Sequence, residues 1–295
     1  MTTARIARAF ALVLAAVVVA GCASSTLTRL AYANAALAYN NLVPTLTWMV
    51  DGYVDLSDAQ EDWVRARISS QVQWHRAKEL PRYGRFLEGV LAKTAQPFTA
   101  DDVAPVYREV RAYYHALAEH TIPDVAEFLA GLNEEQVAQL ARKFSDDNRK
   151  FERESLNGTP QERRRKRMHR FVGHLEGWVG SLEREQRELV AAFYAEMLDF
   201  SDELLGERRF RQGEILSIVR ARASREQANA QLKRLLVDTD SWRRPEYIEK
   251  VRARDRKMFE LLGKLSATLT ERQRAALQDR LRGFIDDVAS LTRAE

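Results

Sequence analysis

The chain has few of the residues that build turns, cross-links and metal sites. Among 295 residues there are 13 glycines, 7 prolines and one cysteine. A β-sandwich or barrel needs a turn about every 8 to 12 residues, and so little glycine and proline cannot supply them. A single cysteine excludes a disulfide scaffold and a multi-cysteine metal site. These absences favour a helical protein.

A surplus of one charge sign is also missing. The 46 basic residues are nearly balanced by 42 acidic ones, which leaves a formal net charge of +4. Nucleic-acid binding requires basic residues that gather on one face of the protein. The composition gives no such footprint, so we expect no nucleic-acid partner.

Long apolar runs are absent except at the N-terminus. Residues 9–20 form an unbroken run after Arg5 and Arg8. A short apolar run behind a basic start, followed by small residues, is typical of a secretory signal peptide and too short for a comfortable membrane span. We expect residues 1–21 to be a signal peptide, and no later segment to span a membrane.

The end of this run reads Val19-Ala20-Gly21-Cys22 and resembles the lipobox of bacterial lipoproteins. The resemblance implies cleavage between Gly21 and Cys22, a diacylglycerol on the Cys22 sulfur and an acyl chain on the new N-terminus. Ala23 follows instead of Asp, which by the Gram-negative sorting pattern points to the periplasmic face of the outer membrane. An ordinary signal peptide or an uncleaved anchor ending in cysteine is the alternative.

Beyond residue 26 nearly every stretch has apolar residues at helical spacing, as in Leu189, Phe193, Met197, Phe200 and Leu204. We expect an all-α protein of about nine helices, forming one elongated bundle over residues 22–295. A division into two lobes, 22–157 and 158–295, is the alternative. The predicted helices cover 26–50, 57–93, 99–120, 123–131, 133–156, 160–180, 181–205, 208–236, 245–265 and 270–293.

Several helix starts share the form Leu–cap–x–x–Gln. It occurs at Leu56–Gln60, Leu132–Gln136 and Leu269–Gln273. A Ser, Thr or Asn at the N-cap accepts a backbone N–H, and the Gln three residues later reaches back to the cap. Leu182–Gln186 keeps the spacing but lacks such a cap residue. The boxes are irregularly spaced along the chain, which argues against a solenoid repeat.

The sequence contains no recognisable catalytic or metal-binding motif. His75 and His120 fit hydrogen-bonded positions at the edge of a core. Glu154-Ser155 resembles the acid and its neighbour in lytic transglycosylases, yet charged residues flank it and the glycine-rich motifs of that family are missing. We expect no enzyme, no metal and no cofactor besides the lipid on Cys22. A cell-wall hydrolase or transglycosylase with Glu154 as general acid is the alternative.

The strongest charge feature is a basic segment after Pro160. It comprises Arg163, Arg164, Arg165, Lys166, Arg167 and Arg170. Consecutive cations cover every side of a helix, so a solvated helix end paired with nearby acids is one interpretation. The other is contact with an anionic partner such as lipid or peptidoglycan.

Four short motifs resemble an uncharacterised proteobacterial lipoprotein family, a domain of unknown function. They are Leu37–Leu42 (LAYNNL), Tyr53–Leu56 (YVDL), Trp74–Arg76 (WHR) and Glu79–Tyr83 (ELPRY). The resemblance implies the lipobox and an all-α fold, and it implies no activity. The Leu–cap–x–x–Gln boxes also resemble the motif of Spy-type periplasmic chaperones, helical cradles that hold unfolded clients.

Together these features predict a non-enzymatic, chaperone-like lipoprotein anchored in the outer membrane. Its partners would be the membrane, through the lipid anchor, and envelope protein clients or peptidoglycan. A structural subunit of an envelope complex is a further alternative.

Overall fold

The computed structural model describes residues 39–293, which contain eleven α-helices, two π-helical segments, one 3-10 turn and no strand. The all-α prediction is confirmed, with more helices than the nine expected. The signal peptide 1–21, with Gly21 and Cys22, lies outside the described residues. The helices are α4 (Leu42–Val54), α5 (Asp58–Trp74), α6 (Leu80–Lys93), α7 (Ala100–Ala130), α8 (Glu134–Phe151), α9 (Pro160–Val179), α10 (Arg184–Glu196), α11 (Ser201–Arg220), α12 (Arg225–Leu236), α13 (Pro245–Ala267) and α14 (Glu271–Arg293).

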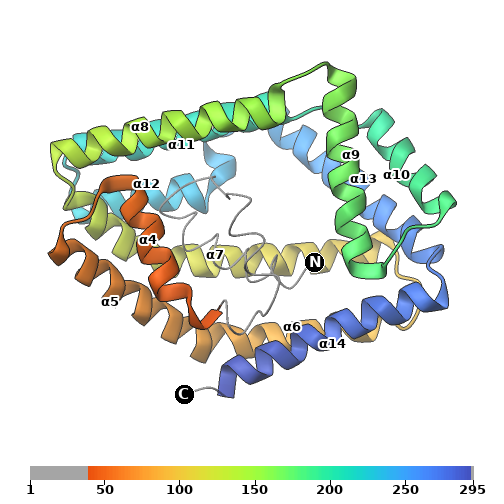
Figure 1. The fold of residues 1–295 in the computed structure, drawn as a ribbon. Helices are drawn as coiled ribbons and strands as arrows, with labels where there is room; N and C mark the ends of the chain where they lie inside the picture. Colours follow the sequence, from red (N-terminus) through yellow and green to blue (C-terminus); the bar gives the residue numbers. More distant parts are fainter. Residues whose placement is uncertain (1–38, 294–295) are drawn as a thin grey trace.

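The helices form a frame around α7, which crosses its middle (Figure 1). α8 lies beside α11 along one edge, α6 beside α14 along the opposite edge, and α9 beside α10 along a third. α12 and α13 pack against α7 from either end of the frame. Within residues 39–293, no helix is both long enough and apolar enough to cross a membrane.

The largest core draws buried residues from α4 to α8 and also from α11 and α12. Leu117 of α7 and Leu232 of α12 are both fully buried in it. Two smaller clusters lie apart, one between α6 and α14 and one among α9, α10 and α13. The division into lobes at residue 157 stays a prediction.

The longest helix runs through a proline that we expected to break it. Ala100–Ala130 form the single helix α7 rather than two, although Pro123 lies inside it. A proline in a helix interior removes one hydrogen bond and costs about 3 kcal/mol. Ala118, Ile122 and Ala126 are buried on both sides of Pro123, and their burial outweighs that cost.

Two other predicted helices end early. The helix expected over 181–205 stops at Glu196, where Met197 takes an extended backbone conformation. The helix expected over 208–236 is interrupted at Arg222, which has a positive φ of 48°. Ser224 follows and caps α12 with a box that sequence reasoning missed, since Gln227 accepts the Ser224 N–H.

The helix expected over 57–93 contains a π-helical turn, η1 (His75–Glu79), just before Pro81. The Leu80 N–H donates to the His75 carbonyl, five residues back instead of four. Pro81 has no N–H to continue the α-helical ladder, so the register changes at this point. Pro81 therefore changes the helical pitch locally, and the chain continues as helix α6.

Four of the Leu–cap–x–x–Gln boxes meet in pairs. Gln60 Nε2 donates to Gln136 Oε1 over 3.1 Å, and Gln136 Nε2 donates back to Gln60 Oε1 over 2.7 Å. Gln186 and Gln273 exchange the same two bonds at 2.8 and 2.9 Å. We call these the first and the second glutamine pair.

The pattern around the two pairs is the same. Each glutamine oxygen also accepts the N–H of its own cap residue. Each Nε2 also donates to the carbonyl that precedes the partner's Leu; these carbonyls belong to Asp55, Gly131, Ser181 and Thr268. All four amides are thereby satisfied, and each pair joins the starts of two helices that are more than 70 residues apart in sequence. Each pair of boxes therefore holds two helix starts together by hydrogen bonds.

Candidate functional site

Three of the four motifs behind the family resemblance contribute side chains to a cluster around η1. The Tyr39 hydroxyl lies 2.8 Å from His75 Nδ1. Glu79 accepts from Arg82 Nη1 at 2.9 Å, and the rings of His75 and Tyr83 are 5.4 Å apart. These motif residues therefore form one polar cluster in the core.

This cluster is closed to ligands. His75, Glu79 and Tyr83 are each 3% exposed. Burial lowers the pKa of His75 to about 4, so its ring is neutral near pH 7. Side chains this deeply buried offer a ligand no surface, and we assign the cluster to the stability of the fold.

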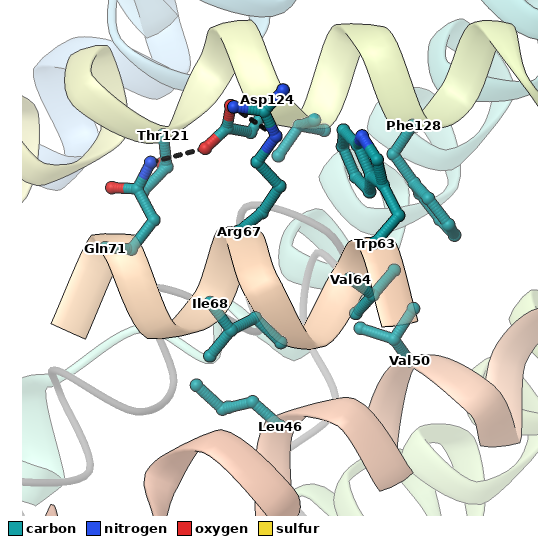
Figure 2. Close-up of a pocket in the computed structure, with 11 residues that line it drawn as sticks. Leu46, Val50, Trp63, Val64, Arg67, Ile68, Gln71, Thr121, Asp124 and Phe128 are labelled. Carbon is teal, nitrogen blue, oxygen red and sulfur yellow. Dashed lines mark hydrogen bonds and ion pairs between the residues drawn. The ribbon is translucent and has the colours of Figure 1, made fainter. Parts of the chain in front are cut away.

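A small apolar hollow lies between α4, α5 and α7 (Figure 2). Its volume is about 60 Å³. Gln71 Nε2 donates to Asp124 Oδ2 over 2.5 Å at its rim, and the Arg67 guanidinium lies over the Trp63 ring, 5.1 Å from the centroid. Ligand pockets usually enclose about 300–1,000 Å³. The hollow is too small, and its polar rim residues already contact one another.

A larger cleft of about 430 Å³ opens between α7, α11, α12 and α13. Cationic and phenolic side chains dominate its lining, with one carboxylate among them. We call it the arginine cleft; its polar lining includes Arg111, Arg211, Arg243, Arg254, Tyr107, Tyr114, Tyr247 and Glu207.

Two of the arginines are held by carboxylates of the protein. Arg243 donates to both oxygens of Glu207, from Nη2 to Oε2 at 3.0 Å and from Nε to Oε1. Arg254 Nη2 donates to Asp255 Oδ1 at 2.7 Å, and the Tyr107 hydroxyl donates to Asp255 Oδ2 at 3.1 Å. These bonds fix two guanidinium groups in the wall of the cleft.

The positive charges of the other two arginines, Arg111 and Arg211, are much less well neutralised by carboxylates. Arg211 Nη1 lies 3.7 Å from Glu207 Oε2, which already pairs with Arg243. Burial lowers the pKa of Arg211; Glu207 opposes this, and the nearby Arg243 adds to it. Arg111 is exposed on α7, and within residues 39–293 it forms no ion pair. A bound anion would stabilise both charges.

The ionisable lining of the cleft consists mainly of hydrogen-bond donors. Its histidine, His115, has a pKa lowered by burial and by Arg111, so it is neutral near pH 7. Across the described part of the chain, no group of three or more His, Cys, Asp or Glu side chains is placed to hold a metal ion. Guanidinium groups and tyrosine hydroxyls donate hydrogen bonds to anions.

The basic segment predicted from sequence divides into two sets on α9. Arg163 Nε and Arg167 Nη1 lie 3.1 and 2.6 Å from the same oxygen of Asp199. Their side chains are only 18% and 19% exposed. Arg165, Lys166 and Arg170 are exposed, and Arg164 is half-buried. Pairing with a nearby acid therefore describes Arg163 and Arg167, and contact of the segment with an anionic partner stays a prediction.

Glu154 lies on the short π-helix η2 (Glu152–Leu156), where its side chain is exposed. A general acid of the transglycosylase type needs a walled site that disfavours its charged form. Glu154 has no such surroundings, so the structure gives no support to this alternative.

Sequence reasoning missed the arginine cleft. Tyr107, Arg111 and Tyr114 lie at i, i+4 and i+7 on one face of α7, and Glu207 and Arg211 lie four residues apart on α11. This spacing was a usable signal, because it places polar groups on a single face. The convergence of the helices was not visible in the sequence.

The fold and the cleft define an all-α protein with a cationic ligand-sized cleft. A family model described as a family of unknown function (DUF6279) matches residues 52–248, about two thirds of the chain. The chain belongs to this family. No curated protein and no solved structure matches it. The expected resemblance to an uncharacterised family is confirmed, and its lipoprotein character stays a prediction.

Proposed function

We propose that this protein is a lipoprotein of the outer membrane that faces the periplasm and binds an anionic envelope component in the arginine cleft. The observation that carries the proposal is the poor compensation of Arg111 and Arg211 in a cleft of ligand size. Acyl chains on Cys22 would hold the protein at the membrane, since each buried CH₂ contributes about 0.8 kcal/mol.

Binding in the cleft needs no chemical step. The anion replaces water at the two arginines, and a charge-assisted hydrogen bond contributes about 1.5–3 kcal/mol. Leu204, Leu235 and Val251 supply an apolar wall beside these charges. The ligand is therefore an anion attached to an apolar group, as in envelope polymers, lipids and acidic proteins.

A photo-crosslinker in living cells tests the proposal. Leu204 lines the cleft and is 40% exposed, while Trp48 is 68% exposed and lies outside it. We expect benzoylphenylalanine at Leu204 to capture an anionic molecule that the same group at Trp48 does not. Adding Arg111→Gln should abolish the adduct, and Cys22→Ser should release the protein from the membrane fraction.

Equal adducts from both positions, or an adduct at Leu204 that survives Arg111→Gln, would contradict binding in the cleft. A protein that stays in the membrane fraction after Cys22→Ser would contradict the lipid anchor alone.

The outward part of the basic segment supports a second candidate, chaperone-like holding of acidic clients. Arg165 and Lys166 are exposed on α9. Arg165→Gln with Lys166→Gln should reduce the suppression of client aggregation at low salt without lowering stability. The matched control is Arg184→Gln, whose side chain is 93% exposed on α10. Unchanged suppression would remove the basic segment from the mechanism.

A further inference from the structure

We infer that the ligand of the arginine cleft is a phosphomonoester dianion carried on a small apolar group. The inference rests on the proposed function and names the chemical class that the cleft selects.

The first argument is charge matching. Four arginines line the cleft, and two carboxylates accept from them, Glu207 in the lining and Asp255 beside it. Four positive charges against two negative ones leave a surplus of two. A phosphomonoester carries about −1.5 to −2 at pH 7, whereas a carboxylate or a phosphodiester carries −1. A dianion therefore neutralises the surplus, and a monoanion leaves one positive charge of the cleft without compensation.

The second argument is the direction of the donors. Arg111 comes from α7, Arg211 from α11 and Arg254 from α13. Donors that converge from three helices surround an anion instead of meeting it in one plane. A phosphoryl group offers three terminal oxygens in a tetrahedral arrangement, while a carboxylate offers two in one plane. The arrangement therefore suits phosphoryl oxygens.

The third argument is the remaining wall. Leu204, Leu235, Leu236 and Val251 line the cleft. Leu204 is 40% exposed; free inorganic phosphate would leave it in water, whereas the alcohol part of an ester would cover it. The alcohol part belongs either to a small soluble phosphate ester or to the headgroup of a phosphomonoester lipid. Both sources share the same phosphoryl chemistry.

Two probes of similar shape and different charge test the inference. Phenyl phosphate is a dianion above its second pKa of about 6, and benzenesulfonate is a monoanion at every pH used. We would measure their binding to the acylated full chain in detergent by calorimetry. At pH 7 we expect phenyl phosphate to bind at least tenfold more tightly than benzenesulfonate.

The pH dependence sharpens this test. About a tenth of phenyl phosphate is dianionic at pH 5 and about nine tenths at pH 7, so its affinity should fall about tenfold between pH 7 and pH 5. Besides the arginines and tyrosines, the ionisable groups at the cleft are His115 on α7, Glu207 on α11 and Asp255 on α13. Any change in them affects both probes, and benzenesulfonate corrects for it.

A pair of matched variants localises the binding. Arg111→Gln should weaken phenyl phosphate at least tenfold, and it should leave folding intact because Arg111 is exposed. Arg184→Gln on α10 should leave affinity unchanged. If Arg111→Gln binds phenyl phosphate as the unmodified chain does, the inference is wrong.

The outcomes separate the inference from the proposed function. Equal affinity for the two probes, lost in Arg111→Gln, would overturn the dianion and keep anion binding. No binding of either probe, with the Leu204 adduct still present, would overturn the phosphomonoester alone. No binding and no adduct would overturn both.

Vesicles then distinguish the two sources. If the ligand is a lipid, phosphatidic acid in phosphatidylcholine vesicles should displace phenyl phosphate, and pure phosphatidylcholine should not. If it is a soluble ester, glycerol phosphate should displace phenyl phosphate and the vesicles should not. Failure of both to compete would contradict the inferred class.

Discussion

The two glutamine pairs use one hydrogen-bond pattern in two different surroundings. In the first pair Gln60 is half-buried and Gln136 is 5% exposed, beside the largest core. In the second, Gln186 and Gln273 are 0% and 4% exposed, next to a cluster of only three buried apolar residues. Polar bonds are more important where the apolar core is small, because fewer other contacts hold the helices together.

The cap residues differ as well. Ser57 and Asn133 start the helices of the first pair, and Glu183 and Thr270 those of the second. Glu183 is not a usual cap residue, yet its N–H still donates to Gln186 at 2.9 Å. The glutamine is therefore the part of the motif that builds the joint, and the cap residue can vary.

The largest expected effect is the loss of stability when a buried leucine is truncated, and it should differ between the largest core and the small cluster. Leu117→Ala in the largest core should lower the free energy of unfolding by about 4 kcal/mol, because the side chain is fully buried among many neighbours. Leu261→Ala in the small cluster should cost about 2 kcal/mol, since most of the side chains that pack there are only partly buried and the site can relax more easily. Urea unfolding measures both. A larger loss for Leu261→Ala would reverse the comparison.

Removing a glutamine should show the opposite order, with the larger loss of unfolding free energy in the second pair. Gln186→Leu removes one donor and one acceptor from the buried Gln273 amide and takes the Gln186 donor from the Thr268 carbonyl, which should cost about 3 kcal/mol. Gln60→Leu should cost about 1 kcal/mol, because water reaches the groups it leaves behind. The same urea experiment applies. Equal losses would mean that burial does not set the strength of these joints.

Acid should weaken the region of the first pair more than that of the second. The folded-state pKa of His75 is about 4, below its ordinary 6.5, because the ring is buried. The unfolded chain therefore binds more protons between pH 6.5 and 4, and this part of the stability is complete above pH 6.5 and lost as pH falls toward 4. The loss should be about 2–3 kcal/mol.

His75→Gln is the control for this prediction, since it removes the titrating ring. Hydrogen exchange at pH 7 and pH 4.5 would follow α5 and α6 separately from α9 and α10. An identical pH response in the unmodified chain and in His75→Gln would contradict the role of His75.

Local signals in the sequence explain how much of this fold was predictable. Helical spacing and the capping boxes depend on neighbours within four residues, so they indicated the fold class and most helix starts. Pro123 misled this reasoning, because the burial of Ile122 and Ala126 that keeps α7 intact is a tertiary effect.

Neither the glutamine pairs nor the arginine cleft could be predicted from local sequence patterns. Gln60 and Gln136 are 76 residues apart, and nothing between them indicates that they pair. The arginine cleft takes Arg111 from α7 and Arg243 from the segment before α13, and neither is unusual where it stands in the sequence. The basic segment was visible because its residues are consecutive, although Asp199, the partner of Arg163 and Arg167, was not.

The contact between α6 and α14 determines when the frame can close. Leu87 on α6 packs against Leu281 and Phe284 on the last helix of the chain. At about 5–20 residues per second, the roughly 200 residues between them take about 10–40 s to synthesise. During that interval the apolar side of α6 has no partner. The order of synthesis therefore leaves this edge of the frame open until α14 has been made.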